Sequence, residues 1–264
     1  DSVDDVAFLA MDLEFLGRKD LADYFVDQYT KCGGDPAPRA LVDFYVAYRA
    51  VVRTKVDCVR VSQGHPEASA DAGRHLDLAL EHLRSGTVRL IIVGGGPGTG
   101  KTTLSTALAA QVGAHVISTD EVRRRLQDDG VVSGAAGELN AGLYSPTNVA
   151  VVYDEVLRQA QAWLTRGHSV ILDGTWRDAQ QSDRARELCR QTSVPIVEFN
   201  CAVPIAEASA RIQHRPRSAS DATPDIAAAL SGAGCGGREA HDIDTGRPLV
   251  DSVKEAQEIC WRAI

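Results

Sequence analysis

Residues 95–102 read Gly95-Gly96-Pro97-Gly98-Thr99-Gly100-Lys101-Thr102. This stretch fits G-x-x-x-x-G-K-[ST], the Walker A pattern of a phosphate-binding loop (P-loop). It follows an apolar run at residues 88–93, which predicts a buried strand, and precedes residues 103–110, which predict a helix. A P-loop requires this strand-loop-helix setting. Two other interpretations are weaker. A glycine-rich turn with a chance lysine does not explain the setting, and no G-x-G-x-x-G of a dinucleotide-binding loop can be placed across these glycines.

The chemistry of such a loop follows from its residue types. The glycines let backbone N–H groups face a polyphosphate, and the helix start adds the positive end of its dipole. Lys101 is expected to reach the β- and γ-phosphates and to act in catalysis, and the Thr102 hydroxyl is expected to ligate Mg²⁺. The predicted cofactors are therefore ATP and Mg²⁺, and the predicted nucleotide-binding residues are Gly95, Gly96, Pro97, Gly98, Thr99, Gly100, Lys101, Thr102 and Thr103.

Composition narrows the class of protein. The chain has 264 residues, a formal net charge of −8 and a sequence pI near 5.4, which argues against a broad nucleic-acid-binding surface. Six cysteines without C-x-x-C spacing indicate free thiols in a reducing cytosol. No membrane span or signal peptide is evident, so the expected location is cytoplasmic. Because the chain starts Asp1-Ser2-Val3 rather than with Met, we expect a fragment or a processed product.

The chain divides into two parts at about residue 86. Residues 1–86 show three- and four-residue apolar spacing typical of helices, interrupted near Gly17, at residues 32–36 and at residues 64–66. In the long helix predicted from residue 40 to residue 61, an apolar and aromatic stripe is expected to pack between helices; it comprises Leu41, Phe44, Tyr45, Tyr48, Val51, Val52 and Val56.

Residues 87–264 alternate between strand and helix patterns. Strands are expected at 88–93, 114–118, 169–172, 195–200 and 241–243, with helices between them and a last helix at 252–263. This alternation predicts an α/β fold: a P-loop NTPase-type parallel sheet with helices on both faces, preceded by the helical segment. Ligands of such sheets bind at the carboxyl ends of the strands.

The second predicted strand ends at Asp120, beside the expected γ-phosphate position. Three roles are open for this carboxylate: accepting a proton from an attacking hydroxyl, holding Mg²⁺ through water, or capping the next helix. Arg123 and Arg124 follow, and they either bind the acceptor or lie on a solvated helix face.

The third predicted strand ends at Asp173, which is typical of a Walker B position that holds Mg²⁺. Trp176 is a candidate for stacking on a substrate ring, with core or rim packing as the alternative.

A cationic cluster follows the fourth strand: Arg211, Arg215 and Arg217, before a loop-like segment. Arginines on a closing lid would neutralise charge on the transferring phosphoryl group. We therefore predict Arg215 as catalytic and Arg211 and Arg217 as nucleotide-binding; a basic surface turn is the alternative.

Together these motifs resemble the small P-loop kinases of the gluconate kinase, chloramphenicol phosphotransferase and zeta-toxin type, over about residues 88–260. The resemblance rests on residues 95–102, Ser118-Thr119-Asp120 with Arg123, Leu172-Asp173-Gly174-Thr175, the arginine cluster and Ile243-Asp244-Thr245. It implies that Asp120 binds or deprotonates the acceptor hydroxyl and that the cluster arginines contact ATP phosphates.

Residues 1 to about 63 resemble the helical C-terminal end of an aminoglycoside-phosphotransferase-like domain. The likeness lies in Asp4-Asp5-Val6-Ala7-Phe8-Leu9-Ala10-Met11-Asp12-Leu13-Glu14 and Phe44-Tyr45-Val46-Ala47-Tyr48-Arg49-Ala50. It implies a two-part bacterial fusion protein, in which a kinase-like domain with its catalytic loop and metal-binding Asp would lie upstream of Asp1.

The sequence thus predicts an ATP- and Mg²⁺-dependent kinase that transfers the γ-phosphoryl group to a hydroxyl of a small molecule, such as a sugar or an antibiotic. Acceptor-binding residues are expected to be Asp120, Arg123, Arg124 and Trp176, and metal-binding residues Thr102 and Asp173. A sugar-nucleotide acceptor, as in zeta toxins, is a variant of this prediction. Two alternatives stay open: a polynucleotide 5′-hydroxyl kinase, made less favourable by the acidic charge, and an ATP-binding switch without an acceptor.

Overall fold

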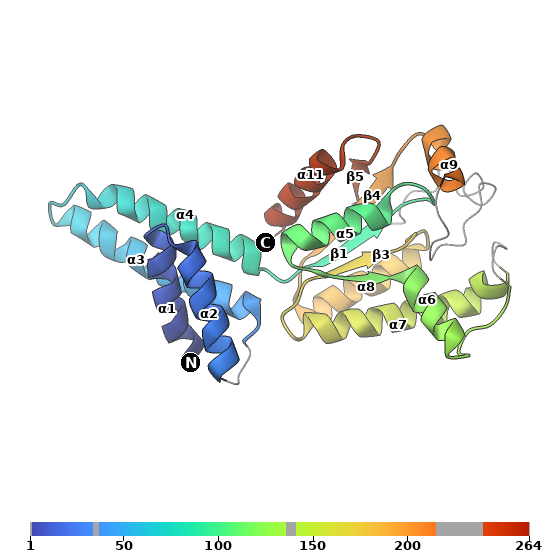
Figure 1. Cartoon of the computed structure of the whole chain (residues 1–264), viewed down its shortest axis with the longest axis horizontal. Coiled ribbons are helices and arrows are strands. Elements are labelled where there is room, and N and C mark those ends of the chain that lie inside the picture. Colours follow the sequence, from blue (N-terminus) through green and yellow to red (C-terminus); the bar gives the residue numbers. More distant parts are fainter. Residues whose placement is uncertain (1, 34–36, 136–140, 215–239, 264) are drawn as a thin grey trace. The chain divides into compact units, whose positions relative to one another are not determined.

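A computed structural model describes residues 2–33, 37–135, 141–214 and 240–263. The chain divides into two compact units, residues 1–88 and residues 89–263. Within the described residues, the first unit is helical and the second contains a five-stranded sheet (Figure 1).

The helical unit is built around an antiparallel hairpin of two long helices. Its elements are α1 (Ser2–Phe15), α2 (Lys19–Gly33), α3 (Arg39–Ser62) and α4 (Ala68–Gly86). Gly64, with a φ of +96°, lies in the turn between α3 and α4. Small side chains let the helices approach closely in the core, which includes Ala7, Ala10, Met11, Ala47, Ala50 and Ala79.

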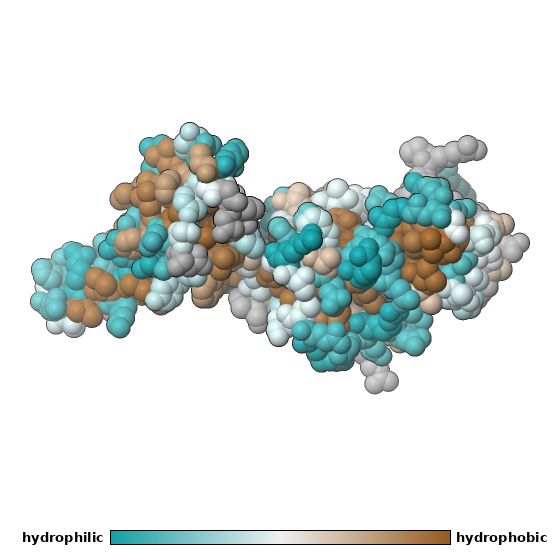
Figure 2. Space-filling model, turned by 90° about the horizontal axis from the view of Figure 1, so that it is seen from below, coloured by the Kyte–Doolittle hydropathy of each residue, from teal (hydrophilic) through white to brown (hydrophobic). Residues whose placement is uncertain are grey.

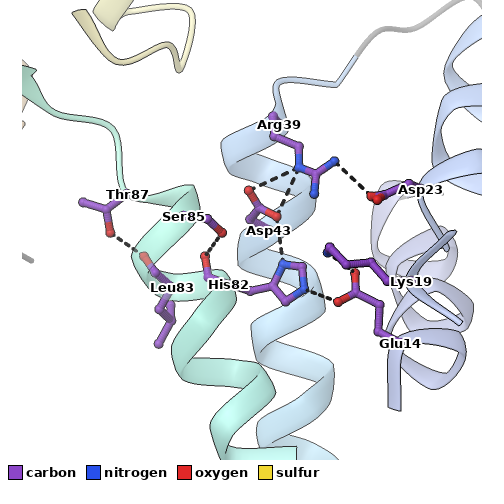
Figure 3. Close-up of polar contacts among 9 residues, drawn as sticks. All are labelled: Glu14, Lys19, Asp23, Arg39, Asp43, His82, Leu83, Ser85 and Thr87. Atoms are coloured by element: carbon purple, nitrogen blue, oxygen red, sulfur yellow. Dashed lines mark hydrogen bonds and ion pairs between the residues drawn. The ribbon is translucent and has the colours of Figure 1, made fainter. Parts of the chain in front are cut away.

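Two buried histidines of α4 join the helices of this unit. His82 Nδ1 lies 2.8 Å from Asp43 Oδ1, and its Nε2 lies 3.1 Å from Glu14 Oε2 (Figure 3). His75 Nδ1 lies 2.9 Å from Asp57 Oδ2. Burial alone would lower the pKa of His82, but the hydrogen bonds to Asp43 and Glu14 and the charges of these carboxylates outweigh it and raise this pKa to about 9. Protonated His82 therefore links α1, α3 and α4 by paired charges in a buried place.

The expectation that the stripe of α3 packs entirely between helices is wrong in part. Phe44, Tyr48, Val51 and Val56 are exposed, whereas their neighbours Val42, Val46, Ala47 and Ala50 are buried. The helix packs through its small residues, so the large ones remain at the surface.

The second unit has a parallel sheet with the order β2-β3-β1-β4-β5. Its strands are β1 (Leu90–Gly94), β2 (His115–Ser118), β3 (Val170–Asp173), β4 (Ile196–Ala202) and β5 (His241–Asp244). The described helices are α5 (Lys101–Val112), α6 (Thr119–Asp128), the short 3₁₀ helix η1 (Gly142–Tyr144), α7 (Pro146–Leu164), α8 (Ala179–Thr192), α9 (Ile205–Gln213) and α11 (Leu249–Arg262). Helices α5 and α11 lie on one face of the sheet and α7 and α8 on the other (Figure 1). The predicted α/β fold is thus confirmed.

Strands β1 and β3 are buried at every position, as expected for parallel strands covered on both faces. The core between the sheet, α5 and α11 includes Ile91, Val93, Leu104, Leu108, Phe199 and Ile243. This packing fixes the carboxyl end of β1, from which the P-loop departs.

The remaining sequence expectations concern membranes and thiols. Among the described residues no helix has the length and apolar character that crossing a bilayer would need. Five cysteines are free: Cys32 and Cys58 are exposed, and Cys189, Cys201 and Cys260 are buried. Cys235 lies outside the described residues.

Candidate phosphate-binding and acceptor site

At Gly98, in the loop between β1 and α5, the backbone has a conformation that only glycine adopts readily. This residue has a φ of +76°, and a Cβ built on it would lie 2.5 Å from the carbonyl oxygen of Ala208 on α9. A side chain here would therefore strain the backbone and collide with α9. Gly100, also left-handed with a φ of +82°, precedes the first residue of α5. The P-loop is thus held against neighbouring backbone, with the start of α5 at its end.

Two side chains of the loop bind the loop itself. Lys101 Nζ donates to the carbonyl oxygen of Gly96 at 2.7 Å, and Thr99 Oγ1 donates to the same oxygen at 2.8 Å. These bonds place the Lys101 ammonium inside the curve of the loop, where a bound phosphate would lie. The predicted position of Lys101 is therefore compatible with a role at the β- and γ-phosphates.

Thr102 and Asp173 are in direct contact. Thr102 Oγ1 donates a 2.7 Å hydrogen bond to Asp173 Oδ2. Asp173 ends β3, and the sheet register sets it beside Val93 of β1 and Ser118 of β2. Burial raises the pKa of the Asp173 carboxyl, against the hydrogen bond from Thr102 and the charge of Lys101. A hydroxyl and a carboxylate paired in this way form the oxygen donor set that Mg²⁺ takes in P-loop proteins.

The end of β2 brings a second carboxylate to the same edge of the sheet. Ser118 is the N-cap of α6, since its side chain accepts a hydrogen bond from the backbone N–H of Glu121. The capping role open to Asp120 is therefore filled by Ser118. Asp120 lies in the first turn of α6 and accepts a 2.6 Å hydrogen bond from Arg123 Nη1.

Arg123 and Arg124 have different surroundings. Arg123 is buried, and its guanidinium carbon lies 4.5 Å from the centre of the Tyr144 ring in η1. Arg124 is exposed, as a solvated helix face requires. Sequence reasoning missed Tyr144 because nothing in its local pattern links η1 to α6.

Trp176 is packed inside the protein. It has no exposed surface, its Nε1 donates to the carbonyl oxygen of Leu172, and its ring meets the Tyr153 ring edge-on with 4.9 Å between centres. This placement corresponds to the core-packing alternative, so we leave Trp176 out of the acceptor-binding residues. Its φ of +48° lies in the left-handed region, which is uncommon for a residue other than glycine.

A cavity of about 380 Å³ adjoins the P-loop and is lined in part by the loop residues Gly98 and Gly100. Arg211 lines it and donates to the carbonyl oxygen of Thr245 at 2.8 Å, while Thr245 Oγ1 donates to the carbonyl oxygen of Thr99 at 2.6 Å. The other lining residues include Lys101, Thr102, Thr103, Arg247, Leu249 and Ser252. Of the predicted arginine cluster, Arg215 and Arg217 lie outside the described residues, as does nearly all of the segment predicted as a lid.

Sequence reasoning did not select Arg247, Leu249 and Ser252. Their signal was available in the segment that follows β5, because β5 lies at the edge of the sheet beside β4 and its carboxyl end faces the same side as the P-loop.

Comparison with known proteins places this site in a family. Residues 90–231 match the AAA domain family AAA_33, which is more than half of the 264-residue chain, and the chain therefore belongs to that family. The match spans the P-loop, Asp120, Asp173 and Arg211.

A protein of Mycobacterium tuberculosis, named only as uncharacterized, is 56% identical over 263 residues. The alignment covers 100% of this chain and 53% of the relative, so the chain spans about half the length of the curated relative.

Solved structures resemble the second unit in fold. A protein of Chloroflexus aurantiacus, provisionally described as a kinase, matches with a TM-score of 0.50 and 22% identity, over 65% of this chain and 98% of that one. A gluconokinase of Sinorhizobium meliloti has a TM-score of 0.46 and 15% identity, over 66% of this chain and 92% of that one. The first of these likenesses supports the α/β fold of the second unit.

Proposed function

We propose that residues 87–264 form an ATP- and Mg²⁺-dependent kinase that transfers the γ-phosphoryl group to a hydroxyl of a small molecule. The observation that carries this proposal is the set of side chains at the carboxyl ends of the neighbouring strands β1, β2 and β3. The Thr102–Asp173 hydrogen bond of 2.7 Å lies beside the P-loop, and the adjacent strand β2 leads directly to Asp120.

The nucleotide would bind through the loop backbone and Lys101, with the rest of the molecule in the adjoining cavity beside Arg211 and Thr245. Mg²⁺ would be held by Thr102 and Asp173. When bound, the ion would neutralise charge on the phosphate oxygens.

The acceptor hydroxyl would approach from the side of Asp120. Its proton passes to the Asp120 carboxylate, its oxygen forms a bond to the γ-phosphorus, and the bond from that phosphorus to the β,γ-bridging oxygen breaks to release ADP. Arg123 holds the Asp120 carboxylate through the 2.6 Å hydrogen bond, and Tyr144 packs on the Arg123 guanidinium. Catalysis would consist mainly of positioning and charge neutralisation.

The proposal for the acceptor rests on charge and on the fold. The net charge of −8 and the resemblance to gluconate kinase, chloramphenicol phosphotransferase and zeta-toxin proteins favour a sugar, an antibiotic or a sugar-nucleotide over a polynucleotide end. The helical residues 1–86 are proposed to be the C-terminal end of an aminoglycoside-phosphotransferase-like domain, whose remaining part would be carried by the longer polypeptide.

The test is ADP release from ATP and Mg²⁺ with a library of sugars, aminoglycosides, nucleosides and 5′-hydroxyl oligonucleotides. We expect acceptor-dependent turnover with one class of small molecule, abolished by Asp173→Asn and retained by the surface control Asp251→Asn. Turnover with oligonucleotides alone would instead identify a polynucleotide kinase. ATP binding without turnover on any acceptor would favour a nucleotide-dependent switch.

A further inference from the structure

The α3–α4 hairpin carries an apolar surface that no other described helix of its unit covers. We call it the hairpin face and define it by Phe44, Tyr48 and Val51 of α3 and Leu76, Leu80 and Leu83 of α4. All six side chains are more than a third exposed, and Phe44, Tyr48 and Leu76 are more than half exposed. Figure 2 shows hydrophobic residues at the surface of this unit among hydrophilic ones.

The hairpin face consists of two rows of side chains, one on α3 and one on α4, and the two rows lie at similar levels of the hairpin. Asp43 meets His82 and Asp57 meets His75, so α3 and α4 run antiparallel and the segment 43–57 lies beside the segment 75–82. Within each row the residues are three or four positions apart, which places them on one side of their helix.

The two rows also lie on the same side of the hairpin, away from α1. Helix α1 contacts α3 through Arg49 and Arg53, which bind Asp4 and Asp12. At 3.6 residues per turn, the α3 row lies roughly 150° around its helix from these arginines.

Helix α4 shows the same relationship. Its contacts with α1 come from Arg74, which donates to the carbonyl oxygen of Phe15, and from His82, which binds Glu14. The α4 row lies roughly 170° around that helix from them. Both rows of exposed side chains therefore lie on the side of the hairpin opposite α1.

We infer that the hairpin face packs against the part of the longer polypeptide that the relatives carry outside the region aligned here. In the M. tuberculosis relative, the aligned region is 53% of the length, so almost as much polypeptide again lies outside that region in the same polypeptide. A covalently joined segment has an effective concentration of roughly millimolar or more, so even a weak intrinsic affinity for the hairpin face would keep it bound. Contiguous apolar surfaces mark such interaction sites.

The composition of the face fits a permanent contact within one polypeptide. None of its six members carries a charge, and two are aromatic, as in the core of an obligate interface. The inference does not depend on the proposed kinase activity, and its test does not use turnover.

The experiment compares thiol labelling in two proteins. In the 264-residue chain, a cysteine replaces one residue at a time: Tyr48 or Val51 on α3, or Leu80 on α4. The same replacements are made at the aligned positions of the full-length M. tuberculosis relative. Val250→Cys on α11 is the matched exposed control, since Val250 is 71% exposed in the second unit. Peptide-resolved mass spectrometry follows labelling by a maleimide, and circular dichroism checks that each variant keeps its helix content.

In the 264-residue chain we expect the hairpin-face cysteines to label about as fast as the Val250→Cys control. In the full-length relative we expect them to label at least about tenfold more slowly than the control. Equal relative rates in the two proteins would overturn the inference. Slow labelling of the hairpin-face cysteines in a dilute solution of the 264-residue chain would also overturn it, because the segment that covers the face would then belong to this chain. Labelling that slows as the 264-residue chain is concentrated would overturn it too, because the occupant would then be a second copy.

Discussion

The Asp120 carboxylate accepts a 2.6 Å hydrogen bond from Arg123 Nη1, one turn further along α6. Arg123 is buried and stacked on Tyr144, so it holds the carboxylate in one orientation at the end of β2. The hydrogen bond fixes the orientation of the Asp120 carboxylate, which is what the proposed role as proton acceptor requires. Its capping role is already filled by Ser118.

Asp120→Asn therefore separates a kinase from a nucleotide switch. The substitution keeps the size of the side chain but removes the charge that takes up the proton. We expect near-normal ATP affinity and phosphoryl transfer lowered by roughly a hundredfold or more. Isothermal titration and acceptor-dependent ADP release measure the two quantities, with Asp128→Asn at the exposed end of the same helix as control. Unchanged transfer would remove Asp120 from catalysis, and rescue by excess Mg²⁺ would make it a metal-binding residue.

Lys101→Ala is expected to leave the fold intact and to lower transfer by at least about a hundredfold, because a cation at the β- and γ-phosphate oxygens is lost. The Lys101 ammonium now binds the carbonyl oxygen of Gly96, so the loop also loses one internal hydrogen bond. Lys254→Ala, at an exposed position of α11, is the control. Wild-type turnover by folded Lys101→Ala protein would show that the reaction takes place elsewhere.

Gly98→Ala and Gly96→Ala form a matched pair within the P-loop. At position 98 the backbone has a φ of +76°, and a Cβ there would lie 2.5 Å from the Ala208 carbonyl oxygen. At position 96 the nearest neighbour of a Cβ would be Thr99 Cγ2, at 3.7 Å. Left-handed backbone costs a residue with a Cβ about 1–2 kcal/mol before the collision is counted. We expect Gly98→Ala to weaken ATP binding by more than about tenfold and Gly96→Ala to change it little. Equal affinities of the two variants in calorimetry would contradict the loop geometry.

His82 gives the helical unit a pH-dependent stability. Its pKa is about 9 in the folded protein against an ordinary value of 6.5, because Asp43 and Glu14 hold its protonated form despite burial. The protonated ring thus contributes stability that is fully present below pH 6.5 and is lost as the pH rises through about 9. The size of the shift corresponds to roughly 3 kcal/mol.

Two probes locate this loss in the helical unit. All three tryptophans, Trp163, Trp176 and Trp261, belong to the second unit, so their fluorescence follows that unit alone. Between pH 6.5 and 9.5 we expect the urea midpoint seen by circular dichroism for the helical unit to fall, and His82→Gln to remove most of this dependence. If the His82→Gln protein kept the full pH dependence, the source would be another group.

Much of the fold could be predicted because its signals are local. The apolar runs that become β1 and β3 and the Walker A spacing each lie within a few residues of one another. The start of α7 also follows a local rule, since Pro146 is its first residue and the Ser145 side chain accepts a hydrogen bond from the Asn148 N–H. Short-range rules of strand burial and helix capping were sufficient for these elements.

The candidate site was only partly predictable. Thr102 and Asp173 were selected as metal-binding residues from separate motifs, and the register of β1 with β3 brings them within hydrogen-bonding distance. Trp176 follows the same strand, yet its left-handed backbone and its contact with Tyr153 turn the ring into the core. The direction in which a side chain turns after a strand depends on the volume left by distant helices, which no local pattern contains.

By itself, the sequence determined the alternation of strands and helices, the phosphate-binding loop and the helical character of residues 1–86, since hydrophobic period and glycine placement act over a few residues. Only the tertiary structure decided that Arg123 orients Asp120 against Tyr144, and that the large side chains of the hairpin face remain exposed while small ones fill the core. These outcomes depend on which segments meet across the fold. The packing of the whole unit decides which segments come into contact, because protein interiors are close-packed and each buried side chain must fit against all of its neighbours.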